Sequence, residues 1–302
     1  FDTQRGYHPD TFYGGIMDAY RRPKYAYYMY MSQRDPLAAS NIFECGPMIY
    51  IAHEMTPFSP KDVSVFTNCD EVRLTVYENG KTITCKQKRN EFMNIPSPII
   101  TFKDLYNYED WKETSRSNHL ENVYIKAEGL INNKVVATHT IRPANRAVKI
   151  KLALDNENTA LIADGSDIVT VVASVVDEMG NVKRFNNQHI SFQIEGEGRI
   201  IGNDSCFVNP SSVIWGEAPV LIQSTTVPDK IKIMAHVTYE GIRTPMRAEL
   251  VIESVAPKIP LLYDKNALPK KKSSITNTQQ NNNMHVDDLK DVYEQQNKFM
   301  QK

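Results

Sequence analysis

The chain has 302 residues, of which 41% are hydrophobic and 24% are charged, which is typical of a globular protein of about two domains. Its 35 Lys and Arg against 36 Asp and Glu give a formal charge of -1, so it lacks the basic excess that binds a phosphate backbone. No apolar run approaches the roughly 20 residues of a membrane-spanning helix. We therefore expect neither a nucleic-acid partner nor a membrane span.

The first 40 residues predict an irregular loop and then a short helix. Residues 1–12 mix aromatic, polar, Gly and Pro residues without periodicity. Pro23 suits the first turn of a helix, and no breaker follows before Asp35 and Pro36.

The predicted helix carries an aromatic face. Tyr27, Tyr30 and Met31 share one side at helical spacing, and Tyr28 borders it. We favour packing against neighbouring elements over ligand stacking as the role of these rings. The partners of this face are expected beyond residue 40.

Residues 41–146 read as a β-sandwich. The segments "MIYIAH", "DVSVFTN", "EVRLTVYENGKTITC", "SPIITF", "NVYIKAEGL" and "KVVATHTIR" are short, β-rich and bounded by turn residues. Asn79-Gly80 between two such runs is a strong hairpin signal. Six or seven strands in about 100 residues predict an immunoglobulin-like sandwich.

Residues 147–255 repeat this pattern. Their segments are "AVKIKLALD", "DIVTVVASVVDEMGNVKRF", "HISFQIEG", "APVLIQSTT", "KIKIMAHVTY" and "MRAELVIES". Residues 179–181 are predicted to turn a hairpin, and we expect a second immunoglobulin-like sandwich.

Residues 256–302 differ in composition, being punctuated by proline, basic and then low in complexity. They predict a flexible linker. Val286, Leu289, Tyr293 and Met300 beyond it favour a partly helical tail.

The sequence shows no motif of a metal, cofactor or nucleophilic site. Cysteines 45, 69, 85 and 206 are scattered without C-x-x-C spacing, so buried free thiols are expected. "GEGRIIG" at 196–202 has the wrong glycine spacing for a dinucleotide fingerprint and continues as a strand. We predict neither a metal nor a cofactor.

The opening of the chain carries a family resemblance. "FDTQRGYHPDTFYGGIMDAYRRPKYAYYMYMSQRDP", followed by "GPMIYIAHEMTPFSPKDVSVFTNCDEVRLTVYENGK", resembles the carboxy-terminal half of family 2 glycoside hydrolases, especially the multidomain β-galactosidases of gut Bacteroidetes. In that family a (β/α)8 barrel ends with an aromatic-Phe-Asp strand, a loop, a "GG-hydrophobic-x-D" turn and an "R-x-P-K-x-x-Y" helix. Phe1-Asp2, residues 14–18, and residues 21–24 with Tyr27 match these elements in order. The resemblance covers roughly the first 255 residues and implies that residues 1–40 are the last loop and helix of the barrel.

The resemblance also implies a chemistry. Family members are retaining glycosidases with two glutamates, on barrel strands that would precede Phe1, so this piece is expected to contain no catalytic residue and to be inactive alone. The loop after the eighth strand shapes the substrate in barrel enzymes. Asp2, Arg5, Tyr7 and His8 are therefore candidates for the rim of a sugar pocket, with a solvated loop as the alternative.

The substrate expected from the resemblance is a neutral sugar, galactose first. Glucuronide-cleaving members carry an Asn-x-Lys pair where this chain has Phe12 and Gly14. A periplasmic or secreted location is favoured by the same resemblance, and a homo-oligomer is compatible with it.

Two other functions stay open. The aromatic segment 104–119, taken as a loop, could present Tyr106 and Trp111 to a polysaccharide as a carbohydrate-binding module. Alternatively, the sandwiches are purely structural spacers.

Overall fold

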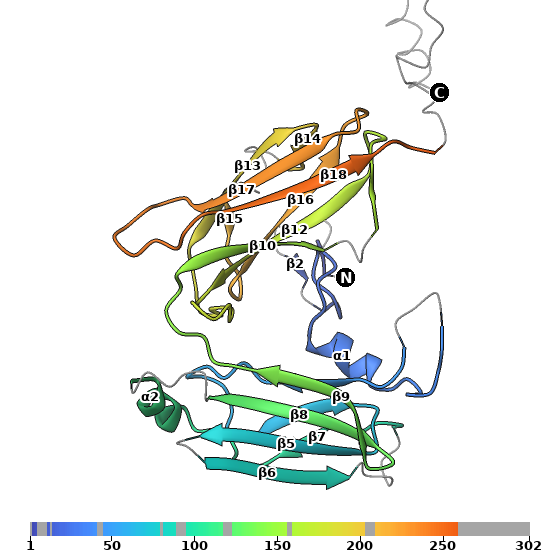
Figure 1. The fold of residues 1–302 in the computed structure, drawn as a ribbon, viewed down its shortest axis with the longest axis vertical. Helices are drawn as coiled ribbons and strands as arrows, with labels where there is room; N and C mark the ends of the chain where they lie inside the picture. Colours follow the sequence, from blue (N-terminus) through green and yellow to red (C-terminus); the bar gives the residue numbers. More distant parts are fainter. Residues whose placement is uncertain are drawn as a thin grey trace, which may run out of the picture. The chain divides into compact units, whose positions relative to one another are not determined.

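The computed structural model describes residues 2–4, 11–12, 14–40, 45–78, 81–88, 95–116, 123–155, 159–202 and 209–258. The chain is mainly β, as the alternating segments predict (Figure 1). Residues 1–258 form one compact unit. Almost all of the predicted linker and tail, residues 256–302, lies outside the described residues, and the predicted domain boundaries stay predictions.

Seven strands form the first sandwich, in two antiparallel sheets ordered β3-β4-β7 and β6-β5-β8-β9. They are β3 (Ile49–Ala52), β4 (Val63–Thr67), β5 (Glu71–Glu78), β6 (Lys81–Lys88), β7 (Ile100–Phe102), β8 (Tyr124–Ile131) and β9 (Lys134–Ile141). Each predicted strand segment of residues 41–146 is confirmed. Glu78 pairs with Lys81, so β5 and β6 form the predicted hairpin with a two-residue connection at 79–80.

The alternation of these strands builds the first core. The buried face of β3 and β4 includes Ile51, Val63 and Val65, and the facing strands β5 and β8 contribute Leu74 and Ile125. These apolar side chains from both sheets pack in one cluster. Their removal from water is the main force that holds the two sheets together.

Nine strands form the second sandwich, in sheets ordered β10-β12-β16-β14 and β11-β18-β17-β13-β15. They are β10 (Lys149–Asp155), β11 (Leu161–Ile162), β12 (Ile168–Val176), β13 (His189–Gly196), β14 (Gly198–Ile200), β15 (Ser211–Ser212), β16 (Glu217–Ser224), β17 (Lys230–Val237) and β18 (Ala248–Val255). The six long strands were predicted, whereas the two-residue strands β11 and β15 were not. Val171, Val220, Ile190 and Ile233 are among the fully buried side chains of the second core.

The predicted turn at 179–181 follows β12. The Asp177 carboxylate accepts hydrogen bonds from the backbone N–H groups of Met179 and Asn181 at 3.0 and 2.8 Å. Gly180 has φ +89°, which suits glycine. Val176 then bridges to Val182, so the chain reverses as the sequence predicts.

Part of segment 104–119 is not the loop that the sequence suggested. Helix α2 occupies Tyr108–Arg116, because Asn107 Oδ1 accepts the Glu109 N–H at its start and acidic residues fill the first turn. Tyr106 is 5% exposed and its hydroxyl donates to Thr56 O at 3.1 Å, so this ring is not presented to a polysaccharide. The Trp111 side chain lies outside the described residues.

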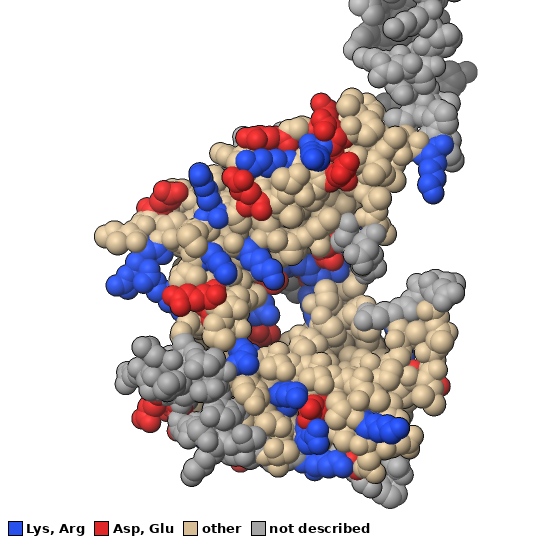
Figure 2. All heavy atoms as spheres, viewed as in Figure 1, with Lys and Arg blue, Asp and Glu red and all other residues tan. Residues whose placement is uncertain are grey.

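Charges of both signs are interspersed over the visible face of the described residues (Figure 2). Within those residues, no helix has the length and hydropathy of a membrane span. Cys69 is a buried free thiol, as predicted, whereas the free Cys45 is only partly buried. The side chains of Cys85 and Cys206 lie outside the described residues.

Candidate functional site

The segment before the first helix is anchored by Asp2. Its carboxylate accepts hydrogen bonds from the Gly15 N–H at 3.0 Å and from Lys24 Nζ at 2.6 Å, and its own N–H donates to Met17 O at 2.9 Å. Asp2 is 6% exposed, so the paired ammonium is needed to offset the cost of a buried carboxylate. This geometry fixes the glycine turn against the start of the helix.

The remaining rim candidates flank a small ladder. β1 (Thr3–Gln4) pairs with β2 (Thr11–Phe12), so the prediction of an irregular loop over 1–12 was wrong for these residues. Arg5, Tyr7 and His8 lie outside the described residues. The pocket role of all four candidates therefore stays a prediction.

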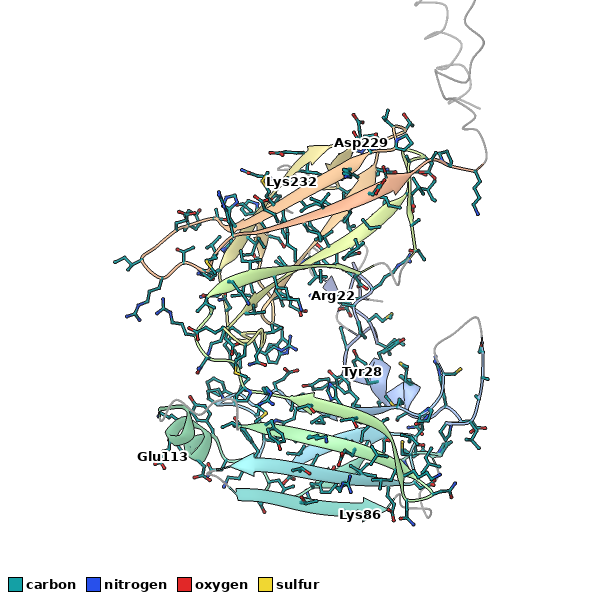
Figure 3. All side chains as sticks on the ribbon, in the orientation of Figure 1. Arg22, Tyr28, Lys86, Glu113, Asp229 and Lys232 are labelled. Atoms are coloured by element: carbon teal, nitrogen blue, oxygen red, sulfur yellow. The ribbon has the colours of Figure 1, made fainter. Side chains whose placement is uncertain are left out.

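A tight reversal over residues 17–23 presents Arg22. Asp18 Oδ1 accepts the backbone N–H groups of Tyr20 and Arg22 at 2.8 and 2.9 Å, and Asp18 Oδ2 accepts Arg22 Nε at 2.6 Å. Met17 bridges to Pro23 across this turn. The Arg22 guanidinium, labelled in Figure 3, is thereby held in one orientation.

Helix α1 (Tyr25–Met31) packs on the first sandwich with a face that matches the predicted one only in part. Tyr28, labelled in Figure 3, lies on this helix. It stacks on Tyr50 of β3, with ring centroids 3.7 Å apart and planes 6° from parallel. Tyr25 meets Tyr50 edge to face at 6.0 Å, and Met31 is buried. Tyr30, placed in the packing face by the sequence pattern, is 58% exposed. The expectation that the partners lie beyond residue 40 is confirmed.

Tyr50 continues this ring stack into the sandwich. It stacks on His139 of β9 at 4.8 Å, and His139 Nδ1 accepts the Ile51 N–H at 3.0 Å. Burial raises the pKa of Tyr50 above its usual range, so its phenol stays protonated near neutral pH. The stack is a neutral and fixed surface against which α1 packs.

Tyr25 connects the helix to Glu54, just after β3. Its hydroxyl donates to Glu54 Oε1 at 2.6 Å. Burial, followed by this hydrogen bond and the Glu54 charge, raises the pKa of Tyr25 well above its usual range. Tyr25 therefore acts as a donor and not as a phenolate.

Alternating charges extend from Glu54 into the second sandwich and back to Arg22. Glu54 Oε2 lies 2.7 Å from Arg184 Nε, and Arg184 Nη1 lies 3.8 Å from Glu217 Oε1. Glu217 Oε2 accepts Arg22 Nη1 at 2.9 Å. We call Asp18, Arg22, Glu217, Arg184 and Glu54 the junction network. It joins the segment before α1 to residues of both sandwiches.

The junction network is suited to positioning and not to proton transfer. Each glutamate in it forms an ion pair with an arginine, and the paired side chains hold each other in place. Among the described residues, no group of three or more His, Cys, Asp and Glu side chains has metal-site geometry. Of the network, only Asp18 and Arg22 lie in a motif singled out in the sequence; Glu54, Arg184 and Glu217 were missed, because nothing local marks a long-range ion pair.

Comparison with known proteins relates this chain to a protein family. Residues 152–242 match the model of glycoside hydrolase family 2 C-terminal domain 5. A β-galactosidase of Thermoanaerobacter pseudethanolicus is 36% identical over 236 residues, which are 75% of this chain and 29% of that protein. The chain belongs to glycoside hydrolase family 2 and corresponds to the C-terminal part of its members.

Other members of glycoside hydrolase family 2 match a similar share of the chain. A β-galactosidase of Bacteroides ovatus is 28% identical over 252 residues, 80% of this chain and 26% of its own length. The crystal structure of a Bacteroides vulgatus β-glycosidase shares the fold with a TM-score of 0.57 at 21% identity, covering 79% of this chain and 28% of that one. This family 2 chain thus spans less than a third of each relative named here.

Proposed function

We propose that this chain is part of a retaining glycoside hydrolase for neutral β-galactosides, in which the two sandwiches support the end of the catalytic barrel. The observation that carries the proposal is the anchoring of Asp2 and of residues 14–31. Tyr28 stacks on the first sandwich, and Arg22 pairs with Glu217 of the second. Both contacts position a segment that resembles the last loop and helix of the family's barrel.

The chemistry of the proposal follows the family's retaining mechanism. One glutamate would protonate the leaving oxygen while a second forms a covalent glycosyl intermediate, and a water then releases the sugar. Both glutamates would lie on barrel strands that precede residue 1. The 302-residue chain is then inactive on its own.

The loop beside Asp2 would shape the sugar pocket. Because the buried Asp2 carboxylate is bound to Lys24 and Gly15, it holds the base of this loop in place. Arg5, Tyr7 and His8, between β1 and β2, would face the substrate at the barrel mouth. Phe12 and Gly14, where glucuronide-cleaving members have an Asn-x-Lys pair, favour a neutral sugar such as galactose.

Hydrolysis of aryl glycosides tests this proposal. The purified 302-residue chain should not turn over an aryl β-galactoside. A longer protein that carries the barrel ahead of this chain should hydrolyse the aryl β-galactoside faster than the aryl β-glucuronide. Turnover by the 302-residue chain, with contaminating enzyme excluded, or a preference for the glucuronide, would contradict it.

Variants of the longer protein separate the roles of the loop residues. His8→Ala and Arg5→Ala should raise KM or lower kcat for the galactoside while leaving the unfolding midpoint unchanged. Asp2→Asn should lower the unfolding midpoint as well, because it weakens the pairing with Lys24. Unchanged kinetics in all three variants would show that the loop does not shape the sugar pocket.

The proposal also gives the two sandwiches a structural role, as spacers that orient the barrel. The contacts of Arg22 and Arg184 favour this role, because they tie the two sandwiches to the segment before α1. A periplasmic or secreted location and assembly into a homo-oligomer belong to the proposal through the family resemblance alone.

A further inference from the structure

Three exposed aromatic rings gather near the junction network. Phe58, Phe185 and Trp215 are 82%, 48% and 49% exposed. Phe185 contacts Phe58 edge to face at 5.3 Å and Trp215 edge to face at 5.4 Å. Large apolar rings in mutual contact at the surface mark a binding site more often than chance exposure does. We call these three residues the ring cluster.

The turn that carries Trp215 is fixed and strained. Ile214 and Glu217 exchange backbone hydrogen bonds of 2.9 and 3.2 Å across a two-residue loop. Trp215 has φ +56°, a left-handed conformation that bulky residues rarely adopt. Strain of this kind persists where the surrounding structure enforces it, and it recurs at ligand-binding positions.

Gly216 shows what enforces the turn. A Cβ on Gly216 would lie 2.6 Å from Val182 Cγ1 and 2.7 Å from Lys183 O, so the backbone is pressed against the 182–183 segment. Arg184 Nη1 donates to Trp215 O at 3.2 Å. The indole is therefore displayed at the surface by a supported backbone.

A hollow with both polar and apolar lining adjoins the ring cluster. Its lining includes Glu54, Thr56, Tyr108, Lys183, Arg184 and Phe185. Its charged lining residues are Glu54, Lys183 and Arg184, and Glu54 is paired with Arg184. Carboxylate and guanidinium groups offer both acceptors and donors in fixed directions.

We propose that the ring cluster and this hollow bind a neutral glycan chain. The aromatic rings would cover the C–H faces of the sugar, and Glu54 and Arg184 would exchange hydrogen bonds with its hydroxyl groups. The Glu54–Arg184 pair neutralises two of the three charged side chains of the hollow, which disfavours a strongly anionic or cationic ligand. Charged residues are depleted from the cores of protein interfaces, so a hollow with this ion pair fits a sugar better than a protein partner.

The choice of galactan as the probe rests on the proposed function, whereas the site itself rests on the geometry. Affinity electrophoresis of the 302-residue chain in gels with and without soluble galactan measures this binding. The wild-type chain should be retarded by galactan, and Trp215→Ala and Phe58→Ala should each lose most of that retardation. Trp111→Ala, the other tryptophan of the chain, is the matched control and should be retarded like the wild type.

Several results would overturn the proposal. One is that the wild-type chain migrates unretarded in both galactan and xyloglucan. Another is that Trp111→Ala abolishes the retardation while Trp215→Ala preserves it. Sedimentation of the same variants tests the other occupant: if Trp215→Ala converts a dimer into a monomer, the ring cluster is an interface between copies of this chain. Because Phe58 is so exposed, Phe58→Ala reports on binding even if Trp215→Ala unfolds.

This experiment is independent of hydrolysis. Failure of the chain to bind galactan and xyloglucan, together with galactosidase activity in the longer protein, would refute the glycan site alone. Binding by the chain without galactosidase activity in the longer protein would refute the proposed enzyme and leave the glycan site standing.

Discussion

Arg22 Nη1 lies 2.9 Å from Glu217 Oε2, so a residue just before the first helix is paired with one at the start of β16, 195 positions later. Arg22 also binds Asp18, and Glu217 also lies beside Arg184. The pair thus joins two local structures that form far apart in the sequence.

Arg22→Ala should lower the free energy of unfolding by about 1–2 kcal/mol, because it removes charged hydrogen bonds to Asp18 and Glu217 at a partly exposed site. Urea denaturation of Arg22→Ala, Glu217→Gln and the double variant measures the coupling. We expect a coupling energy of about 0.5–1 kcal/mol. Strictly additive effects would show that the pair contributes nothing.

Tyr28→Ala should cost about 2 kcal/mol of stability, because it removes the ring that stacks on Tyr50. Tyr30→Ala is the matched control on the same helix, and its effect should stay within about 0.5 kcal/mol since that ring is exposed. Thermal unfolding of both variants checks the prediction. Equal losses of stability in the two variants would mean that the helix packs through another face.

Acid should weaken the first sandwich through two histidines. Burial lowers the pKa of His53 and of His139 below the ordinary 6.5. Between the lowered pKa and 6.5 the unfolded chain binds more protons than the folded one, so stability present above pH 6.5 is lost as the pH falls through this window.

Urea midpoints at several pH values between 7.5 and 5 measure this loss. His139→Gln should flatten the dependence, because it removes one of the two groups that titrate. A slope that is the same in the variant and the wild type would exclude His139 as a source.

Two glycines with positive φ should respond differently to alanine. At Gly216, with φ +83°, a new methyl group meets Val182 and the backbone of Lys183, so Gly216→Ala should cost about 2–4 kcal/mol from strain and overlap together. At Gly180, with φ +89° and no atom within 4 Å of the added carbon, Gly180→Ala should cost about 1 kcal/mol from strain alone. Chemical denaturation of the two variants checks the order, and a larger loss for Gly180→Ala would contradict it.

The strands were predictable from the sequence because a half-buried sheet leaves a two-residue alternation in every strand. Ile49 and Ile51 of β3 and the Asn79-Gly80 hairpin are local signals of this kind. The packing face of α1 was not predictable, because seven residues fit several helical stripes, and only the position of Tyr50 selects Tyr25 and Tyr28.

The candidate site was less accessible to sequence reasoning. Asp2 was identified through the family motif, but its pairing with Lys24 was not foreseen. The partnership of Arg22 with Glu217 leaves no local pattern. Trp215 had one overlooked signal: a Trp-Gly pair directly before an apolar strand indicates a tight turn with an exposed ring.

The stack of Tyr28, Tyr50 and His139 also constrains the order of events during synthesis. His139 leaves the ribosome more than a hundred residues after Tyr28, so this ring stack is incomplete when α1 first emerges. A seven-residue helix is too short to persist in water without such support. Helix α1 therefore reaches its final packing only after β9 has been synthesised.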